Sequence, residues 1–135
     1  GSQMFLNRLN DKEKVSFLKV AHYVALSDND FSESQESIIE KYCMEMQVSD
    51  VDFDMNKFDI KRELSEVTDP VSRKIFLLEV MALVYSDSYL HPDEKKVLDE
   101  MIMVFDLKDA LAVVYSEWAK SILALYVQGQ ALLEL

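Results

Sequence analysis

Two short acidic segments hold the side chains best suited to chemistry in this sequence. The first contains Asp28 and Asp30, and the second contains Asp87 and Glu94. Carboxylate oxygens are hard ligands of the kind that Ca²⁺ and Mg²⁺ take. These four residues are therefore candidate metal ligands, and Ca²⁺ or Mg²⁺ is the only cofactor that the sequence suggests.

The same segments also contain helix-start signals. Residues 32–35 read Ser-Glu-Ser-Gln, an S-x-x-Q capping box. Residues 91–94 read His-Pro-Asp-Glu, with proline at the first helical position and a carboxylate at the third. Gln35 stands where the second segment has Glu94, so only the second segment keeps a full pair of carboxylates. These residues are compatible with cation binding and also with a role that is limited to helix capping.

Other residues with chemical potential are isolated. His22 lies on an apolar helical stripe and His91 lies at a helix start, and with the single Cys43 they lack the close spacing of a zinc site. Glu79 falls in an apolar run, where a carboxylate finds a partner, shifts its pKa or faces solvent. Two glycines in the chain exclude a glycine-rich phosphate loop. We therefore expect a protein that is not an enzyme.

The sequence predicts that these residues lie on or between α-helices. Cap signals followed by apolar residues at three- and four-residue spacing predict a series of helices. The run after Asp69 and Pro70 is apolar almost all round, which indicates a buried central helix. Phe53 and Phe58 are expected to anchor an acidic connector. The predicted helices cover about residues 11–27, 33–47, 59–67, 70–85, 92–105 and 109–135.

Composition supports an all-α single domain. Two glycines and two prolines in 135 residues leave few hairpin turns, and half of the residues are hydrophobic. The net charge of −11 repels phosphate backbones, so nucleic acid is excluded as an expected partner. One cysteine and no visible signal peptide favour a cytoplasmic location. Residues 1–3, which precede Met4, read as a cloning remnant.

The two halves of the chain repeat at an offset of 59 positions, from Ser27 to Ser86. Each half reads helix, acidic turn, helix, and apolar residues such as Val48 and Leu107 occupy matching positions. Neither hairpin could bury its apolar stripe alone. We therefore expect six to seven helices, arranged as two pseudo-symmetric helix–turn–helix units around the buried helix 70–85.

This pattern resembles the TerB-like tellurite-resistance family of helical domains. Asp87, Leu90 and Glu94 match the second turn of that family, and Asp28 and Phe31 match its first. The resemblance covers about residues 9–107, within an expected domain of 4–108. The chain departs from the family pattern at Asn29 and Ser88, where glycine is usual after the aspartate, and at Gln35, where glutamate is usual.

The resemblance implies a non-enzymatic module in a metal or tellurite (oxyanion) stress response. It also implies cation binding through the acidic turns and a protein partner that is associated with a membrane. The alternative from the residues themselves is a structural adaptor that binds another protein and has no metal site.

The helix expected at 109–135 lies beyond both the repeat and the resemblance. Its apolar stripe either packs on the domain or joins a partner or dimer surface, so we expect a monomer or a homodimer. Because Glu117 and Lys120 leave no run of 18 apolar residues, we expect no direct membrane insertion. The candidate partner-binding residues are Trp118, Ile122, Leu125, Tyr126, Leu132 and Leu133.

Overall fold

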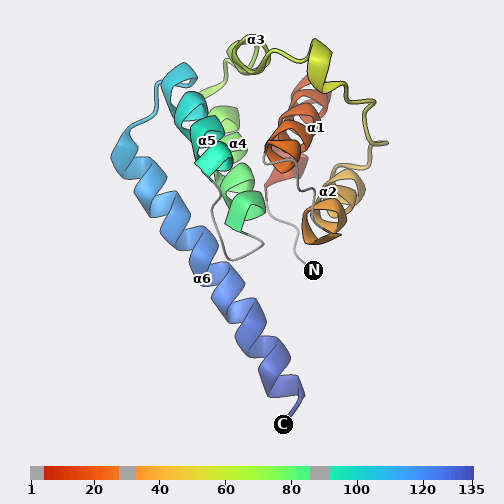
Figure 1. Ribbon diagram of the computed structural model, residues 1–135, viewed down its shortest axis with the longest axis vertical. Helices are drawn as coiled ribbons and strands as arrows, with labels where there is room; N and C mark the ends of the chain where they lie inside the picture. The colour runs from red at the N-terminus through yellow and green to blue at the C-terminus, as the bar shows by residue number, and fades with distance from the viewer. Residues whose placement is uncertain (1–4, 28–32, 86–91) are drawn as a thin grey trace.

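The computed structural model describes residues 5–27, 33–85 and 92–135, and these ranges form one all-α domain (Figure 1). Six α-helices and two short 3₁₀-helices lie within the described ranges, which confirms the expected fold class. In chain order they are η1 (Leu6–Arg8), α1 (Asp11–Leu26), α2 (Glu33–Met46), η2 (Met55–Lys57), α3 (Ile60–Ser65), α4 (Pro70–Val84), α5 (Pro92–Val104) and α6 (Asp109–Leu133).

Local capping explains where several helices begin. Asn10 and Glu13 form a reciprocal capping box before α1, with bonds of 2.8 and 2.9 Å between each backbone amide and the other side chain. Asp59 accepts bonds from the first amides of α3. Asp69 caps α4, and Pro70 takes the first helical position, where its missing N–H costs nothing. The helix starts predicted at these residues are confirmed.

The two helical hairpins end in matching C-terminal caps. Gln47 after α2 and Asp106 after α5 have φ angles of 56° and 54°. In each case this amide donates to the carbonyl three residues earlier, and the next amide donates to the carbonyl five residues before it. These bonds define a Schellman motif. Gln47 and Asp106 are separated by 59 positions, the same offset as Ser27 and Ser86, so these two caps occupy equivalent positions of the sequence repeat.

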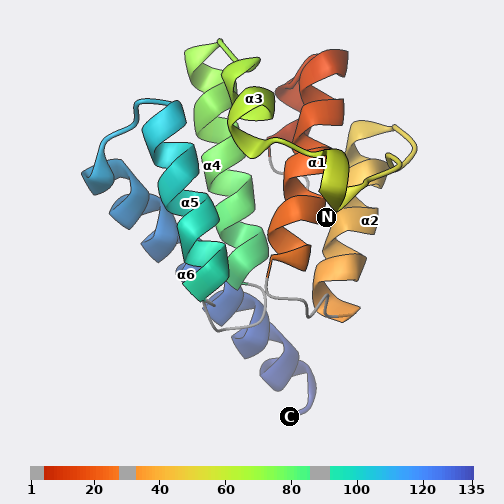
Figure 2. The same cartoon turned by 45° about the horizontal axis from the view of Figure 1, so that its top comes forward.

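The core lies between α1 and α4, with α2 and α5 on the outer sides of this pair (Figure 2). Phe76 of α4 meets Phe17 and Phe105 edge to face, with ring centroids 5.3 and 6.0 Å apart. All three of these rings are buried. The prediction that helix 70–85 is central and buried is therefore confirmed, while the pseudo-two-fold relation between the hairpins stays a prediction.

The two halves of α6 differ in their contact with the rest of the domain. Its first half packs against α4, with Ala119 buried and Tyr115 and Trp118 partly buried against the core. Its second half extends past the end of the domain, as Figures 1 and 2 show. We call residues 121–133 the distal half of α6.

Candidate functional site

The structure places only one of the four predicted metal ligands. Asp28, Asp30 and Asp87 lie outside the described residues. Glu94 lies in the first turn of α5 with its side chain fully buried. Among the described residues there is no group of three or more histidine, cysteine, aspartate or glutamate side chains placed to hold a metal ion. The cation site at the acidic turns therefore stays a prediction.

Two carboxylates hold the N-terminal segment, in an arrangement that we call the carboxylate clasp. Oε1 of Glu79 in α4 accepts a hydrogen bond from the amide of Phe5 at 3.2 Å. Oε2 of Glu45 in α2 accepts one from the amide of Leu6 at 3.0 Å. Leu6 is buried, and the Phe5 ring lies 6.4 Å from that of Trp118. The clasp thus joins η1 to α2, α4 and α6.

Glu79 is 1% exposed, and burial raises its pKa to about 7. The amide of Phe5 opposes this shift, and the negative charge of Glu45 adds to it. Oε2 of Glu79 has no hydrogen-bond partner among the described residues. Burial also raises the pKa of Tyr42 well above its usual range, so this hydroxyl, which donates to the Glu79 carbonyl at 3.1 Å, stays neutral. Glu79 therefore belongs to the core rather than to a solvent-facing site.

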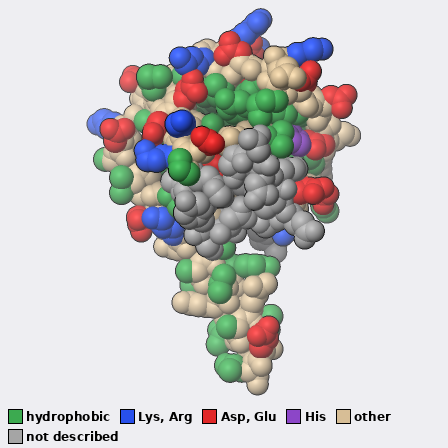
Figure 3. Space-filling view, in the orientation of Figure 1, with side chains coloured by type: hydrophobic (Ala, Val, Ile, Leu, Met, Phe, Trp, Pro, Cys, Tyr) green, Lys and Arg blue, Asp and Glu red, His purple; other side chains and the backbone are tan. Residues whose placement is uncertain are grey.

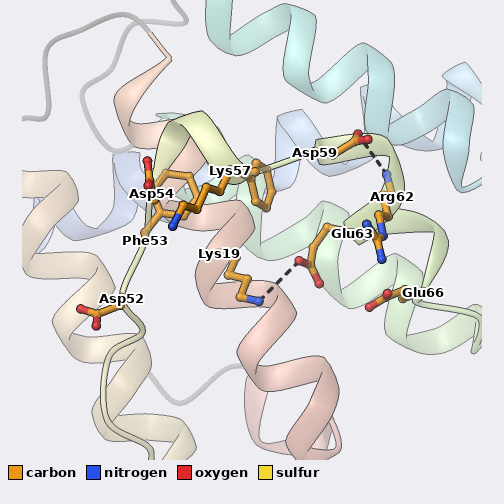
Figure 4. A pocket seen from close by; sticks show the side chains of 10 residues that line it. Lys19, Asp52, Phe53, Asp54, Lys57, Asp59, Arg62, Glu63 and Glu66 are labelled. Carbon is orange, nitrogen blue, oxygen red and sulfur yellow. Dashed lines mark hydrogen bonds and ion pairs between the residues drawn. The ribbon is translucent and has the colours of Figure 1, made fainter.

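A hollow of about 400 Å³ opens between α1, the connector around η2, and α3 (Figure 4). Asp54 and Asp59 at its rim cap η2 and α3. Glu63 accepts a hydrogen bond from Ser16 at 2.8 Å and pairs with Lys19 at 3.7 Å. These carboxylates are thus engaged in holding helices. The side chains that line the hollow include no serine, cysteine or histidine.

His22 lies beside the same connector. Its Nε2 is 2.8 Å from Oδ1 of Asp50, and its ring stacks on Phe53 with centroids 5.7 Å apart. Phe58 packs against Tyr23 of α1 at 4.9 Å. The predicted anchoring role of both connector phenylalanines is confirmed, and His22 serves in that packing.

The distal half of α6 exposes a row of large hydrophobic side chains. Successive residues of an α-helix turn by about 100°, which places six residues of this half on one side. We call them the distal stripe: Ile122, Leu125, Tyr126, Gly129, Leu132 and Leu133. The five large side chains of the stripe are exposed, from 37% for Ile122 to 89% for Leu133. Figure 3 shows hydrophobic side chains spread along this projecting part.

The distal stripe continues the face that packs on the domain. Tyr115, Trp118 and Ala119 lie seven residues before Ile122, Leu125 and Tyr126, and they are among the residues of α6 that the domain covers. Trp118 therefore belongs to the internal contact rather than to a free surface. The other predicted partner-binding residues are exposed, but their role in binding stays a prediction.

By length and composition, α6 could also cross a membrane. Its most apolar 18-residue window has a mean hydropathy of 1.3, and 6% of that window is buried. The interruption of the apolar run by Glu117 and Lys120 therefore does not by itself exclude a membrane span. They lie with Glu134 on the side opposite the distal stripe, which is the pattern of an amphipathic helix. The absence of membrane insertion stays a prediction, and it rests on the placement of these charged residues along one side of the helix.

Comparison of the chain with protein-family models, with curated proteins and with solved structures found no match.

Proposed function

We propose that this protein is a non-enzymatic helical module that binds a protein helix through the distal stripe of α6. The observation that carries the proposal is a row of exposed apolar side chains that continues, in register, a face already used for helix packing. Contiguous exposed apolar surface of this kind marks interaction sites in soluble proteins.

The spacing of the stripe favours a helix as the partner. Residues at i, i+3, i+4, i+7, i+10 and i+11 from Ile122 present one continuous edge, the pattern that helix-in-groove and helix–helix recognition use. The distal half carries no charged residue, so the contact is apolar rather than ionic. The hollow beside α3 offers the weaker alternative, because three of its carboxylates, Asp54, Asp59 and Glu63, are engaged in caps, a hydrogen bond and an ion pair.

The role in metal or tellurite stress stays a prediction from the TerB-like resemblance. Its cation chemistry depends on Asp28, Asp30 and Asp87, which lie outside the described residues, and on Glu94, which is buried. A stress-response module and a structural adaptor can share the same binding helix. The helix-binding proposal therefore holds for either role.

Site-specific photo-crosslinking in the cells that produce the protein tests the proposal. A photo-reactive residue at Leu125 lies on the distal stripe, and the same residue at Val127 lies on the opposite side at similar exposure. We expect a discrete adduct from Leu125 that is missing from Val127. Equal adducts from both positions, or none from Leu125, would show that the stripe binds no protein.

A further inference from the structure

We propose that the helix bound by the distal stripe is the distal half of α6 from a second copy of this chain, in an antiparallel arrangement. This inference rests on the proposed function and identifies its partner. Three features of the helix carry it: its neutral edges, its single interior glycine and the side on which its charges lie.

The edges of the distal stripe are self-complementary. Gln128 borders the stripe on one side and Gln130 borders it on the other. A carboxamide both donates and accepts hydrogen bonds, so a glutamine edge can face an identical edge across a two-fold axis. A glutamate or lysine edge would repel its own copy. The chain as a whole carries a charge of −11, and the distal half carries no charged residue, so contact between two distal stripes adds no further like-charge repulsion.

Gly129 lies in the middle of the distal stripe, although glycine destabilises a helix interior relative to alanine. No described residue of its own chain explains it, since a Cβ added there would meet no described atom within 4 Å. The close approach of another helix would explain it. In an antiparallel pair centred on the stripe, Tyr126 of one copy lies over Gly129 of the other, so that the largest side chain fills the gap left by the smallest residue.

The antiparallel direction follows from the position of the domain. A parallel pair would bring the two acidic domains together at the same end of the helices, and each chain carries a net charge of −11. An antiparallel pair places them at opposite ends, where salt screens their repulsion more completely. The acidic residues Glu117 and Glu134 then stay on the outer side of the pair.

A lipid bilayer is the competing occupant. A helix that lies on a membrane surface usually carries lysine and arginine on its polar side. The polar side of α6 carries Lys120 between Glu117 and Glu134, which an anionic membrane does not attract. The sidedness therefore favours a second protein helix.

Sedimentation velocity over a concentration series tests the second copy. We expect reversible dimerisation of the wild-type chain, weakened by at least about tenfold in Leu125→Glu, because this change would bury an unpaired charge. Val127→Glu adds the same charge on the opposite side and should keep wild-type dimerisation. Both positions lie beyond the part of α6 that packs on α4, so the melting of the domain should stay unchanged.

Disulfide trapping tests the direction of the pair. In a Cys43→Ser background, a mixture of the Ile122→Cys and Leu133→Cys variants should form a mixed disulfide under mild oxidation. A parallel pair would instead give two separate homodisulfides, because the two positions lie about 16 Å apart along the helix and a disulfide needs Cα atoms within about 7 Å.

A monomer at every concentration would overturn the second-copy inference, and so would binding of the monomer to phosphatidylcholine vesicles through Leu125. The proposed function fails separately. If the purified chain is monomeric while Leu125 still crosslinks in cells to a different protein, the helix-binding proposal stands and only the identity of the partner is wrong.

Discussion

The carboxylate clasp predicts an unusual dependence of stability on pH. Burial raises the pKa of Glu79 to about 7, so the folded state holds a proton that an unfolded chain, in which the pKa of a glutamate is near its ordinary value of 4.5, would release. A raised acid pKa contributes stability that is fully present below the unfolded value. That stability is lost as the pH rises towards and through the folded value. The clasp should therefore weaken the fold between these two values.

The size of the effect follows from the shift itself. Each unit of difference between folded and unfolded pKa corresponds to about 1.4 kcal/mol, so the full loss is about 3 kcal/mol. Between about pH 5.5 and about pH 8 the free energy of unfolding should fall by about 2 kcal/mol through this group alone. Such a loss is a sizeable part of the stability of a small domain.

Glu79→Gln removes the titrating group and keeps an oxygen that can accept from the Phe5 amide. The new amide nitrogen takes the place of Oε2, which has no partner among the described residues, and its cost does not change with pH. The test therefore compares how steeply the free energy of unfolding changes with pH in the two proteins. The absolute free energy of unfolding is not part of the comparison. We expect a flatter slope in Glu79→Gln than in the wild-type chain.

Urea unfolding followed by helical CD, repeated across that pH range, measures the slope. Glu66→Gln serves as the control, because Glu66 is exposed and should keep the wild-type slope. Parallel slopes for the wild-type chain and Glu79→Gln would refute the reasoning. So would a wild-type stability that rises with pH across this window while Glu79→Gln stays flat, since that result would require a lowered pKa.

Three further outcomes are expected. Gln47→Gly should stabilise the fold by up to about 1 kcal/mol in thermal or urea unfolding, because glycine adopts the left-handed cap conformation at φ 56° without strain; a loss of stability would contradict this view of the cap. Phe76→Ala should destabilise by about 3–5 kcal/mol in the same measurement, since it empties the centre of the aromatic cluster. If the acidic turns bind Ca²⁺, calorimetry should detect it with the wild-type chain and lose it with Asp87→Asn combined with Glu94→Gln, and an unchanged signal in the double variant would remove these residues as ligands.

The helix boundaries could be predicted from the sequence because their signals are local. Asn10, Asp59 and Asp69 each cap amides within three residues, so these helix starts can be predicted without knowledge of the fold. The left-handed caps were harder to foresee. Gln47 and Asp106 adopt a conformation for which glycine is the usual signal, and only the repeat offset connects them.

The carboxylate clasp could not be predicted, because its partners lie far apart in sequence. Glu79 stood out as a carboxylate in an apolar run, but its bond reaches an amide 74 positions away. Nothing in the sequence around Glu45 indicates that its side chain bonds to the N-terminal segment. The pattern of α6 had a different limit: Trp118 and Leu125 lie on the same stripe, yet one packs on the domain and the other is exposed. An apolar stripe in the sequence identifies the face of a helix that is suited to packing. The stripe does not indicate how much of that face the domain of the same chain buries, which only the folded structure shows.

The projection of α6 also bears on how the helix forms. A segment of 13 residues with a glycine near its middle has little helical stability of its own in water, because propagation must offset a costly nucleus. The distal half gains little packing from its own domain, so its amides should exchange with solvent much faster than those of the α4-bound half. Association with a partner would then order the segment as it binds. The helical content of this protein should therefore rise with its own concentration, and the dimer would be assembled by completing a helix rather than by docking one that is already rigid.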